Sequence, residues 1–453
     1  MARPTPLSGF PEWLPAQRVV EAEVIERLRR TFELHGFAGI ETRAVEPLEQ
    51  MLRKGEIDKE VYLLRRLHAD PDEAETAGSA LGLHFDLTVP FARYVLEHAG
   101  KLTFPFRRYQ IQKVWRGERP QEGRYREFVQ ADIDVVDVDT LAPQHDAEMA
   151  RVMAEALSAL PLPAFRLQVN NRKLIEGFYR GLGIDQVDVP AVMRVVDKLD
   201  KVGQPGVRAM LTDDVGLDDK RTSAALALAA IASADPRAVE AAVAELGVSD
   251  PLLDEGLAEL VAVLEATASV RSDRVAVVAD LAIARGLDYY TGTVYETRMA
   301  GFESLGSICS GGRYDALASD GRTTYPGVGI SFGVTRALAP LFARGLLTAS
   351  RPTPTAVVVA VVDEAHRAAS DAVATALRAR GIACEVSPTA AKFGKQIRFA
   401  DRRGIPFVWF PAGATESGVD EVKDIRSGDQ APADPATWTP PAEDLRPHIV
   451  TTA

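Results

Sequence analysis

The chain is poor in cysteine and has no long apolar run. Cys309 and Cys384 are the only two cysteines in 453 residues, and neither lies in a CxxC or Cys/His cluster. This excludes a disulfide framework and a zinc ribbon, and we expect both thiols to be small core residues. No run of about 18 uncharged apolar residues occurs, and the N-terminal residues form no apolar signal segment. We therefore expect a cytoplasmic protein that does not enter a membrane.

The chain also lacks an excess of basic residues. Lys and Arg number 52 against 64 Asp and Glu, which gives a net charge of −12. This excludes a uniformly basic nucleic-acid-coating protein, so any contact with nucleic acid must come from local basic patches. No GxxxxGK[ST] motif is present, and the glycines at 311–312 and 327–333 lack Rossmann spacing.

Hydrophobic periodicity predicts a mixture of strands and helices. Apolar residues recur every fourth position from Val20 to Phe32, which predicts a helix over residues 17–36. Residues 81–90 alternate and predict a strand with Asp86 and Thr88 on its polar face. Two strands joined by a loop of glycine and proline are predicted at 104–116 and 124–138. Further strands are predicted at 275–283, 293–296 and 306–309, and a helix at about 331–345.

The order of these elements predicts an α+β fold with an antiparallel core rather than a doubly wound sheet. At roughly 150 residues per domain, the length predicts about three domains. We expect a core from 1–170 with 271–348, an alanine-rich helical insertion at 171–270, and a small α/β domain at 355–453. In this last domain we expect strands at 355–362, 381–386 and 407–410 and helices at 364–380 and 391–403.

The predicted hairpin carries a concentration of arginine. Residues 107–126 include seven basic and two acidic side chains, a net charge of +5. A solvated basic ribbon is the ordinary interpretation of such a run. Here, however, the arginines flank a turn beside a polar strand face that bears Gln130 and Asp134, and convergent guanidinium groups suit phosphate.

Two more segments combine glycine with polar side chains. Arg285–Gly292 places an arginine in a glycine turn before Tyr289 and Tyr290. Gly311–Asp315 and Gly327–Gly333, the latter followed by Arg336, have glycines that would permit a close backbone approach to a ligand. Each segment alone is also compatible with ordinary packing at the end of a strand.

Taken together, the motifs resemble those of class II aminoacyl-tRNA synthetases, in the form found in the histidyl-tRNA synthetase family. Arg116–Phe128 resembles motif 2, Arg285–Thr293 the histidine signature, Pro326–Arg336 motif 3, and Asp86–Thr88 the amino-acid-binding strand. The resemblance covers nearly the whole chain and implies an antiparallel catalytic core, a helical insertion and an anticodon-binding domain. It implies ATP-dependent activation of L-histidine and transfer to the 3′ end of the histidine tRNA, with release of AMP and pyrophosphate.

The resemblance also implies roles for residues around ATP. Arg124 would bind the phosphates and Arg336 the outer phosphate, while Glu118 would help to orient the nucleotide. Arg285 would lie between the carboxylate and the α-phosphate, so Arg285 and Arg124 are the expected catalytic residues. Mg²⁺ would be held mostly by the nucleotide rather than by a protein cluster.

For histidine, the resemblance implies a site with three parts. Asp134 and Tyr290 would bind the imidazole nitrogens, with Tyr289 nearby. Gln130, Asp86 and Thr88 would hold the α-amino end, and Arg116 and Arg285 the carboxylate side. Gln130 and Asp134 share a strand face roughly 13 Å long, which suits a ligand that lies along the strand.

Partners are implied as well. The C-terminal domain would contact tRNA through a basic helix bearing Lys392, Lys395, Arg398, Arg402 and Arg403. A homodimer is expected, although Arg43 stands where motif 1 usually has proline, and Ser310 replaces a usual glycine. Two rival functions are a non-catalytic, histidine-sensing regulatory subunit of ATP phosphoribosyltransferase and a generic α/β nucleotide-binding module. The arginines at 124, 285 and 336 and the residues after the core argue against the first. The generic module explains neither the histidine signature nor the two-domain layout.

Overall fold

The computed structural model describes residues 4–52, 60–68, 80–283 and 289–452. The chain forms two compact units. The first comprises the residues up to Pro11 together with Ile25–Pro340, and the second comprises Glu12–Val24 and the residues from Leu341 onward. None of the helices within these described ranges is both long and apolar enough to cross a bilayer.

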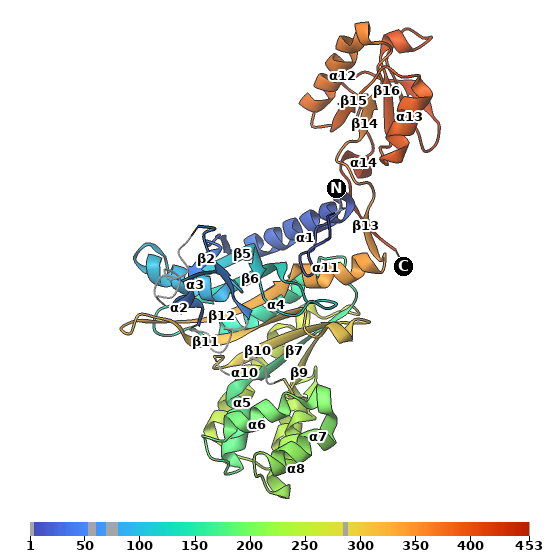
Figure 1. The fold of residues 1–453 in the computed structure, drawn as a ribbon. Coiled ribbons are helices and arrows are strands. Elements are labelled where there is room, and N and C mark those ends of the chain that lie inside the picture. Colours follow the sequence, from blue (N-terminus) through green and yellow to red (C-terminus); the bar gives the residue numbers. More distant parts are fainter. Residues whose placement is uncertain (1–3, 53–59, 69–79, 284–288, 453) are drawn as a thin grey trace. The chain divides into compact units, whose positions relative to one another are not determined.

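The first unit is built on a nine-stranded sheet whose neighbours are mostly antiparallel (Figure 1). Among the described strands of this sheet, only two neighbouring pairs are parallel: Ala38–Gly39 with Phe106–Trp115, and Phe165–Asn171 with Val275–Asp280. This confirms the expected antiparallel α+β core. In spatial order the strands are β1 (Ala38–Gly39), β5 (Phe106–Trp115), β6 (Glu127–Val136), β12 (Thr324–Gly333), β11 (Cys309–Ser319), β10 (Thr293–Met299), β7 (Phe165–Asn171), β9 (Val275–Asp280) and β8 (Ala232–Ser233).

The predicted long hairpin is present as β5 and β6, which pair in register from Phe106 opposite Val136 to Trp115 opposite Glu127. Strand β6 is buried on both faces along most of its length. Ala131, Ile133 and Val135 form its apolar face. The opposite, polar face is therefore enclosed rather than solvated, which is unusual unless its groups find partners or a ligand.

Two predicted strands differ from the structure. Residues 81–90 form only a short strand, β4 (Leu81–Leu83), and the chain then enters helix α3 (Thr88–His98). The Asp86 carboxylate accepts a hydrogen bond from the Val89 amide at 3.1 Å, and Pro90 follows in the first turn, so local helix-starting groups override the alternation. The strand predicted at 306–309 begins only at Cys309, where β11 (Cys309–Ser319) starts, and the glycine-containing segment Gly311–Asp315 lies inside this strand.

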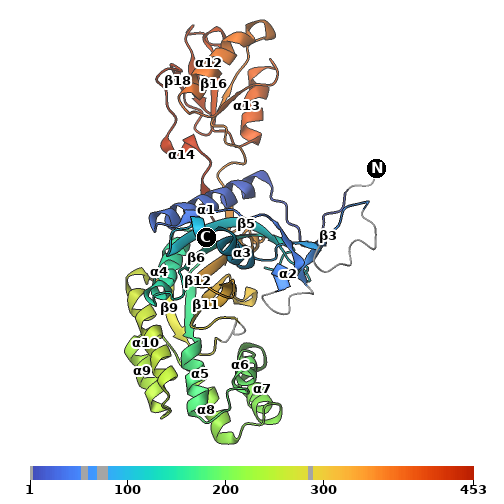
Figure 2. The same ribbon diagram turned by 90° about the vertical axis from the view of Figure 1, so that its left-hand side faces the viewer.

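Helices of the first unit cover this sheet and extend from it (Figure 2). Helix α4 (Gln144–Ser158) contacts β6 and β12, and its methionine and valine side chains are buried. The helix-rich stretch contains α5 (Arg172–Gly181), α6 (Val189–Val196), α7 (Leu199–Asp213), α8 (Asp219–Ala229), α9 (Pro236–Glu245) and α10 (Pro251–Ala266). A small sheet, β2 (Val45–Pro47), β4 and β3 (Tyr62–Leu64), lies beside α2 (Leu48–Met51) and α3.

Two helices run across the boundaries between the units. Helix α1 (Pro15–Leu34) confirms the helix predicted from the four-residue repeat, because Val20, Val24, Leu28 and Phe32 are all fully buried. Helix α11 (Val334–Ala343) begins directly after β12, close to its predicted start.

The C-terminal residues form a five-stranded mixed sheet flanked by two long helices. Strands β14 (Val357–Val359), β15 (Cys384–Val386) and β16 (Phe407–Phe410) are parallel, and helices α12 (Arg367–Ala379) and α13 (Phe393–Arg402) lie between them in sequence. All five elements agree with the predicted alternation. Strands β17 (Glu421–Asp424) and β18 (Gln430–Pro432) extend the sheet, α14 (Ala442–Leu445) follows, and β13 (Leu347–Ala349) pairs with β19 (Ile449–Thr451).

Candidate active site

A cleft opens over the end of the β5–β6 hairpin and the start of α11. It contains about 550 Å³ of empty space, part of which is open to solvent. Its wall includes four side chains expected to bind ATP or the substrate carboxylate: Arg116, Glu118, Arg124 and Arg336. The other lining residues are Gly123, Tyr125, Phe128, Gln130, Ser307, Ile308, Cys309, Ser310, Ser331 and Gly333.

Glu118 lies between two of these arginines. Its carboxylate is 3.3 Å from Arg124 Nη1 and 3.7 Å from Arg116 Nη1. Arg124 is half exposed, so this pairing is weak and readily exchanged for another anion. Arg116 is held more firmly, because its Nε donates to the Phe85 carbonyl at 3.0 Å and its guanidinium stacks over Phe128.

Arg336 reaches the cleft from the first turn of α11. Its Nη2 donates to the carbonyl of Leu305, and its side chain passes close to three glycines, Gly123, Gly306 and Gly333. A Cβ on Gly333 would lie 3.2 Å from Arg336 Cβ, so the end of β12 leaves room for this arginine. The expected arginines at 124 and 336 thus share one cleft, whereas Arg285 lies outside the described residues.

A second, smaller cavity adjoins the first. It contains about 250 Å³ of empty space and shares Ser310 and Ser331 with the cleft. Its other lining residues are Thr88, Asp132, Asp134, Tyr290, Gly311, Gly312, Tyr314, Gly329 and Ile330. Three expected histidine-binding residues, Thr88, Asp134 and Tyr290, therefore meet here, beside the cleft that holds the expected ATP-binding residues.

Asp134 is held from both sides of its strand. In the sheet register it lies opposite Arg108 on β5 and opposite Gly329 on β12. Arg108 Nη2 approaches Asp134 Oδ2 at 2.6 Å, and the Tyr314 hydroxyl donates to Oδ1 at 2.9 Å. A Cβ on Gly329 would come within 2.0 Å of that same Oδ1, so only glycine fits opposite this carboxylate.

Gln130 and Asp132 continue the polar face toward the cleft. Gln130 Nε2 donates to Ser331 Oγ at 2.8 Å, whereas its buried Oε1 has no hydrogen-bond partner among the described residues. Such a group favours an N–H donor from a ligand. Burial raises the pKa of Asp132 to about 7, Arg108 opposes this rise, and Asp134 adds to it.

Tyr290 of the predicted histidine signature lines the second cavity, and Tyr289 packs against it. The rings of Tyr289 and Tyr290 lie 4.1 Å apart between centroids, and the Tyr290 carbonyl accepts from Arg172 Nη1 at 3.0 Å. Burial raises the pKa of Tyr290 well above its usual value, and Tyr289 and Asp134 raise it further. The Tyr290 hydroxyl therefore stays protonated and can serve as a neutral hydrogen-bonding group.

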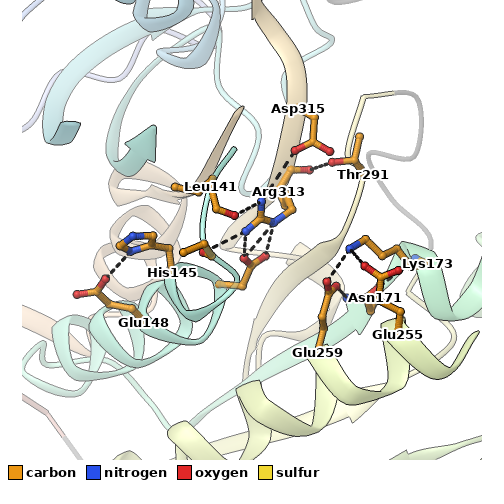
Figure 3. A network of polar contacts seen from close by, with 12 residues as sticks. Leu141, His145, Glu148, Asn171, Lys173, Glu255, Glu259, Thr291, Arg313 and Asp315 are labelled. Carbon is orange, nitrogen blue, oxygen red and sulfur yellow. Dashed lines mark hydrogen bonds and ion pairs between the residues drawn. The ribbon is translucent and has the colours of Figure 1, made fainter. Parts of the chain in front are cut away.

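The structure assigns Arg313 a packing role. In Figure 3 its guanidinium points toward the segment that leads into α4, where it pairs with Asp146 of that helix at 2.6 Å and donates to the carbonyl of Leu141, just before the helix, at 3.1 Å. The same figure shows Lys173 between Glu255 and Glu259, which joins α5 to α10. The glycines next to Arg313 also serve packing, because a Cβ on Gly311 would lie 2.1 Å from the Gly329 carbonyl oxygen. Gly311 and Gly312 also line the second cavity.

Comparison with known proteins now gives the family. A family model described as Histidyl-tRNA synthetase matches residues 9–337. The chain belongs to the histidyl-tRNA synthetase family. A Histidine–tRNA ligase of Cutibacterium acnes is 60% identical over 458 residues, covering 100% of both chains, and one of Micrococcus luteus is 59% identical, covering 99% of each. The crystal structure of a Nostoc histidyl-tRNA synthetase superposes with a TM-score of 0.82 at 35% identity, covering 96% of this chain and 97% of that one.

A second family model, described as Anticodon binding domain, matches residues 356–434 of this histidyl-tRNA synthetase family member. The expected basic helix is α13. Lys392, Lys395, Arg398 and Arg402 are exposed on or beside it, while Gln396 and Ala400 face the domain core. Arg403 differs from the other four, because it pairs with Glu385 at 2.5 Å and stacks on Phe399.

Proposed function

We propose that the protein is a histidine–tRNA ligase. It activates L-histidine with ATP to form histidyl adenylate and pyrophosphate, and then transfers the histidyl group to the 3′ end of the histidine tRNA with release of AMP. The observation that carries this proposal is the pair of adjoining cavities: a cleft rich in arginine beside a small polar cavity, with Ser310 and Ser331 in both walls.

In the cleft, Arg124 and Arg336 bind the phosphates of ATP, and Arg116 binds the carboxylate of histidine near the α-phosphate. Two anionic groups must meet for the carboxylate oxygen to attack the α-phosphorus, so positioning and charge stabilisation supply most of the rate enhancement. The weak pairing of Arg124 with Glu118 lets the phosphates displace Glu118, which then orients the nucleotide. The motif resemblance also gives Arg285 a place between carboxylate and α-phosphate.

Mg²⁺ is proposed to arrive with the nucleotide. Across the described ranges, no group of three or more His, Cys, Asp or Glu side chains is placed to hold a metal ion. Glu118 supplies a carboxylate in the cleft wall, so a metal bound mainly by phosphate oxygens and water fits this donor set. Bound there, it would offset the charge of the outer phosphates.

In the small cavity, the imidazole lies between Asp134 and the Tyr290 hydroxyl, with Tyr289 packed behind. Gln130 Oε1 accepts from the α-ammonium group, which satisfies its buried and otherwise unpaired oxygen. Thr88 and Asp86, at the start of α3, complete the amino end of the site. A site with polar groups that only histidine can pair discriminates by about 10⁴–10⁵ against apolar amino acids.

Further proposals concern tRNA and assembly. Residues 171–270 form a helical insertion in a core of 1–170 and 271–348, and residues 355–453 bind the anticodon region through α13. The protein works in the cytoplasm as a homodimer. At the motif 1 position where proline is usual, Arg43 pairs with Glu46 at 3.4 Å and Glu97 at 3.3 Å.

The regulatory-subunit alternative is not favoured. Relatives identical at 59–60% over their full lengths are named Histidine–tRNA ligase. A regulatory subunit/histidyl-tRNA synthetase structure from Bacillus halodurans shares 20% identity, a likeness of fold alone.

Exchange of pyrophosphate into ATP tests the proposal. The purified protein is expected to catalyse this exchange in the presence of L-histidine and not with the other amino acids. An absence of histidine-dependent exchange from folded protein would reject catalysis.

A further inference from the structure

Arg108 is a buried cation directly behind the proposed imidazole site. Its side chain is 0% exposed, and its guanidinium lies 4.3 Å above the Phe91 ring. Its other hydrogen bonds to described residues are long, at 3.4 Å, to Gln110 Oε1 and the Leu87 carbonyl. Arg108 lines neither cavity. It therefore acts on the small cavity through the carboxylates in its wall: it pairs with Asp134 and lowers the pKa of Asp132.

Arg108 and Tyr314 together fix the state of the Asp134 carboxylate. The guanidinium occupies Oδ2 and the hydroxyl occupies Oδ1. An arginine stays protonated at all ordinary pH values, so the charge of Asp134 is balanced by a permanent partner. Each carboxylate oxygen has a second lone pair, so Asp134 can still accept one N–H from the cavity.

The other titratable groups around Asp134 do not supply this balance. Asp132 on the same strand and Asp86 before α3 are acidic. Tyr290, before β10, and Tyr314, on β11, interact with the carboxylate, and Tyr289 lies beside Tyr290. Burial raises the pKa of Tyr290 and of Tyr314 well above the usual value, so both remain neutral donors or acceptors. Among these groups Arg108 is the cation.

We propose, on the basis of the histidine-binding function given above, that Arg108 is a positioning residue that makes the cavity select neutral imidazole. Because Asp134 is already charge-balanced, it needs no proton from the ligand. It accepts the single N–H of the neutral ring, and the unprotonated ring nitrogen turns toward the Tyr290 hydroxyl. The wild-type protein thus binds histidine without taking up a proton at the ring end.

Loss of the cation changes this proton balance. With a neutral residue at 108, the complex of Asp134 with imidazole carries an uncompensated buried negative charge. A proton taken up by either partner relieves it. Histidine binding then becomes linked to proton uptake, so the Michaelis constant rises with pH by up to about tenfold per pH unit.

The test compares variants in histidine-dependent ATP–pyrophosphate exchange between pH 7.0 and 8.5, at saturating ATP. This range lies above the usual ring pKa of about 6.5. Arg108→Met and Arg108→Gln remove the charge, Arg108→Lys keeps it, and Arg108→Met with Asp134→Asn removes both charges. The readout is the histidine KM of each variant divided by that of the wild type at the same pH, which cancels the titration of free histidine. Thermal unfolding identifies the variants that fold.

The ratio for Arg108→Met or Arg108→Gln is expected to exceed tenfold at pH 8.5 and to fall steeply toward pH 7.0. The kcat should change less than the KM. Arg108→Lys and the double variant should raise the KM without a slope. A flat ratio in a folded neutral variant, or an equal slope in Arg108→Lys, would overturn the inference. Failure of the proposed function is distinct, because the wild type itself would then show no histidine-dependent exchange.

Discussion

The glycine opposite Asp134 provides a sharp perturbation of the site. In Gly329→Ala the new Cβ would lie 2.0 Å from Asp134 Oδ1, 2.5 Å from its Cγ and 2.8 Å from the Ile133 carbonyl oxygen. The Ile133 carbonyl belongs to the backbone of the sheet and cannot move easily, so the Asp134 carboxylate has to shift instead. Restoring ordinary contact of about 3.4 Å requires a shift of roughly 1.4 Å, which exceeds the tolerance of a hydrogen bond.

That shift disrupts the contacts that hold Asp134 to Tyr314 and Arg108 and moves it away from the imidazole. Hydrogen bonds to a charged group contribute about 1.5–3 kcal/mol, so histidine kcat/KM should fall about 10- to 150-fold. The KM for ATP should stay within about threefold, because Gly329 does not line the ATP cleft. Gly100→Ala is the matched control, since a Cβ there meets nothing within 4 Å. An unchanged kcat/KM for histidine in folded Gly329→Ala would refute Asp134 as the ring-binding group.

Three further changes test other parts of the account. Arg124→Gln should raise the ATP KM about tenfold or more, because it removes a charged contact to phosphate. Arg119→Gln, on the same loop but outside the cleft wall, should leave the ATP KM unchanged. Equal effects of the two variants would contradict the role of Arg124 in phosphate binding. The double variant Lys395→Glu with Arg398→Glu should weaken tRNA binding, measured by filter binding, and leave pyrophosphate exchange unchanged. The slope of log affinity against log salt concentration should fall by about one for each lost phosphate contact. An unaltered slope would show that α13 does not bind tRNA phosphates. Asp132 has a folded pKa of about 7, above its unfolded value, so its ionisation costs stability as pH rises through roughly 4–7. The free energy of unfolding of the wild type should therefore fall relative to Asp132→Asn by up to about 1.4 kcal/mol per pH unit over that range, and parallel curves in denaturant titrations would contradict the raised pKa.

Much of the fold could be predicted because its local signals agree with its tertiary environment. The four-residue repeat in α1 and the alternation in β6 each describe a face that is fully buried. The strands and helices at 355–410 were likewise predictable from β-branched and alanine-rich runs. The reason for glycine at 311–312 could not be predicted, because it is the close approach of Gly329 and Tyr290 inside the sheet.

The residues expected to contact the substrate could be predicted from the sequence, but the residues that hold them in position could not. Gln130 and Asp134 could be identified from strand alternation and family motifs. Arg108 appeared in the sequence only as one of seven basic residues of the hairpin. Its pairing with Asp134 depends on the β5–β6 register. If the two predicted strands are paired from the loop outward, Arg108 falls opposite a residue within one or two positions of Asp134. Tyr314 reaches Asp134 from β11, which joins the site through β12, and no local pattern reveals such a contact.

The most direct measurement is a crystal structure of the protein with ATP and histidinol, an alcohol that cannot be activated. The imidazole is expected between Asp134 and Tyr290, with one ring nitrogen within hydrogen-bond distance of the carboxylate, and the phosphates beside Arg124 and Arg336. A ring bound away from β6, or a nucleotide outside the arginine-lined cleft, would contradict the account.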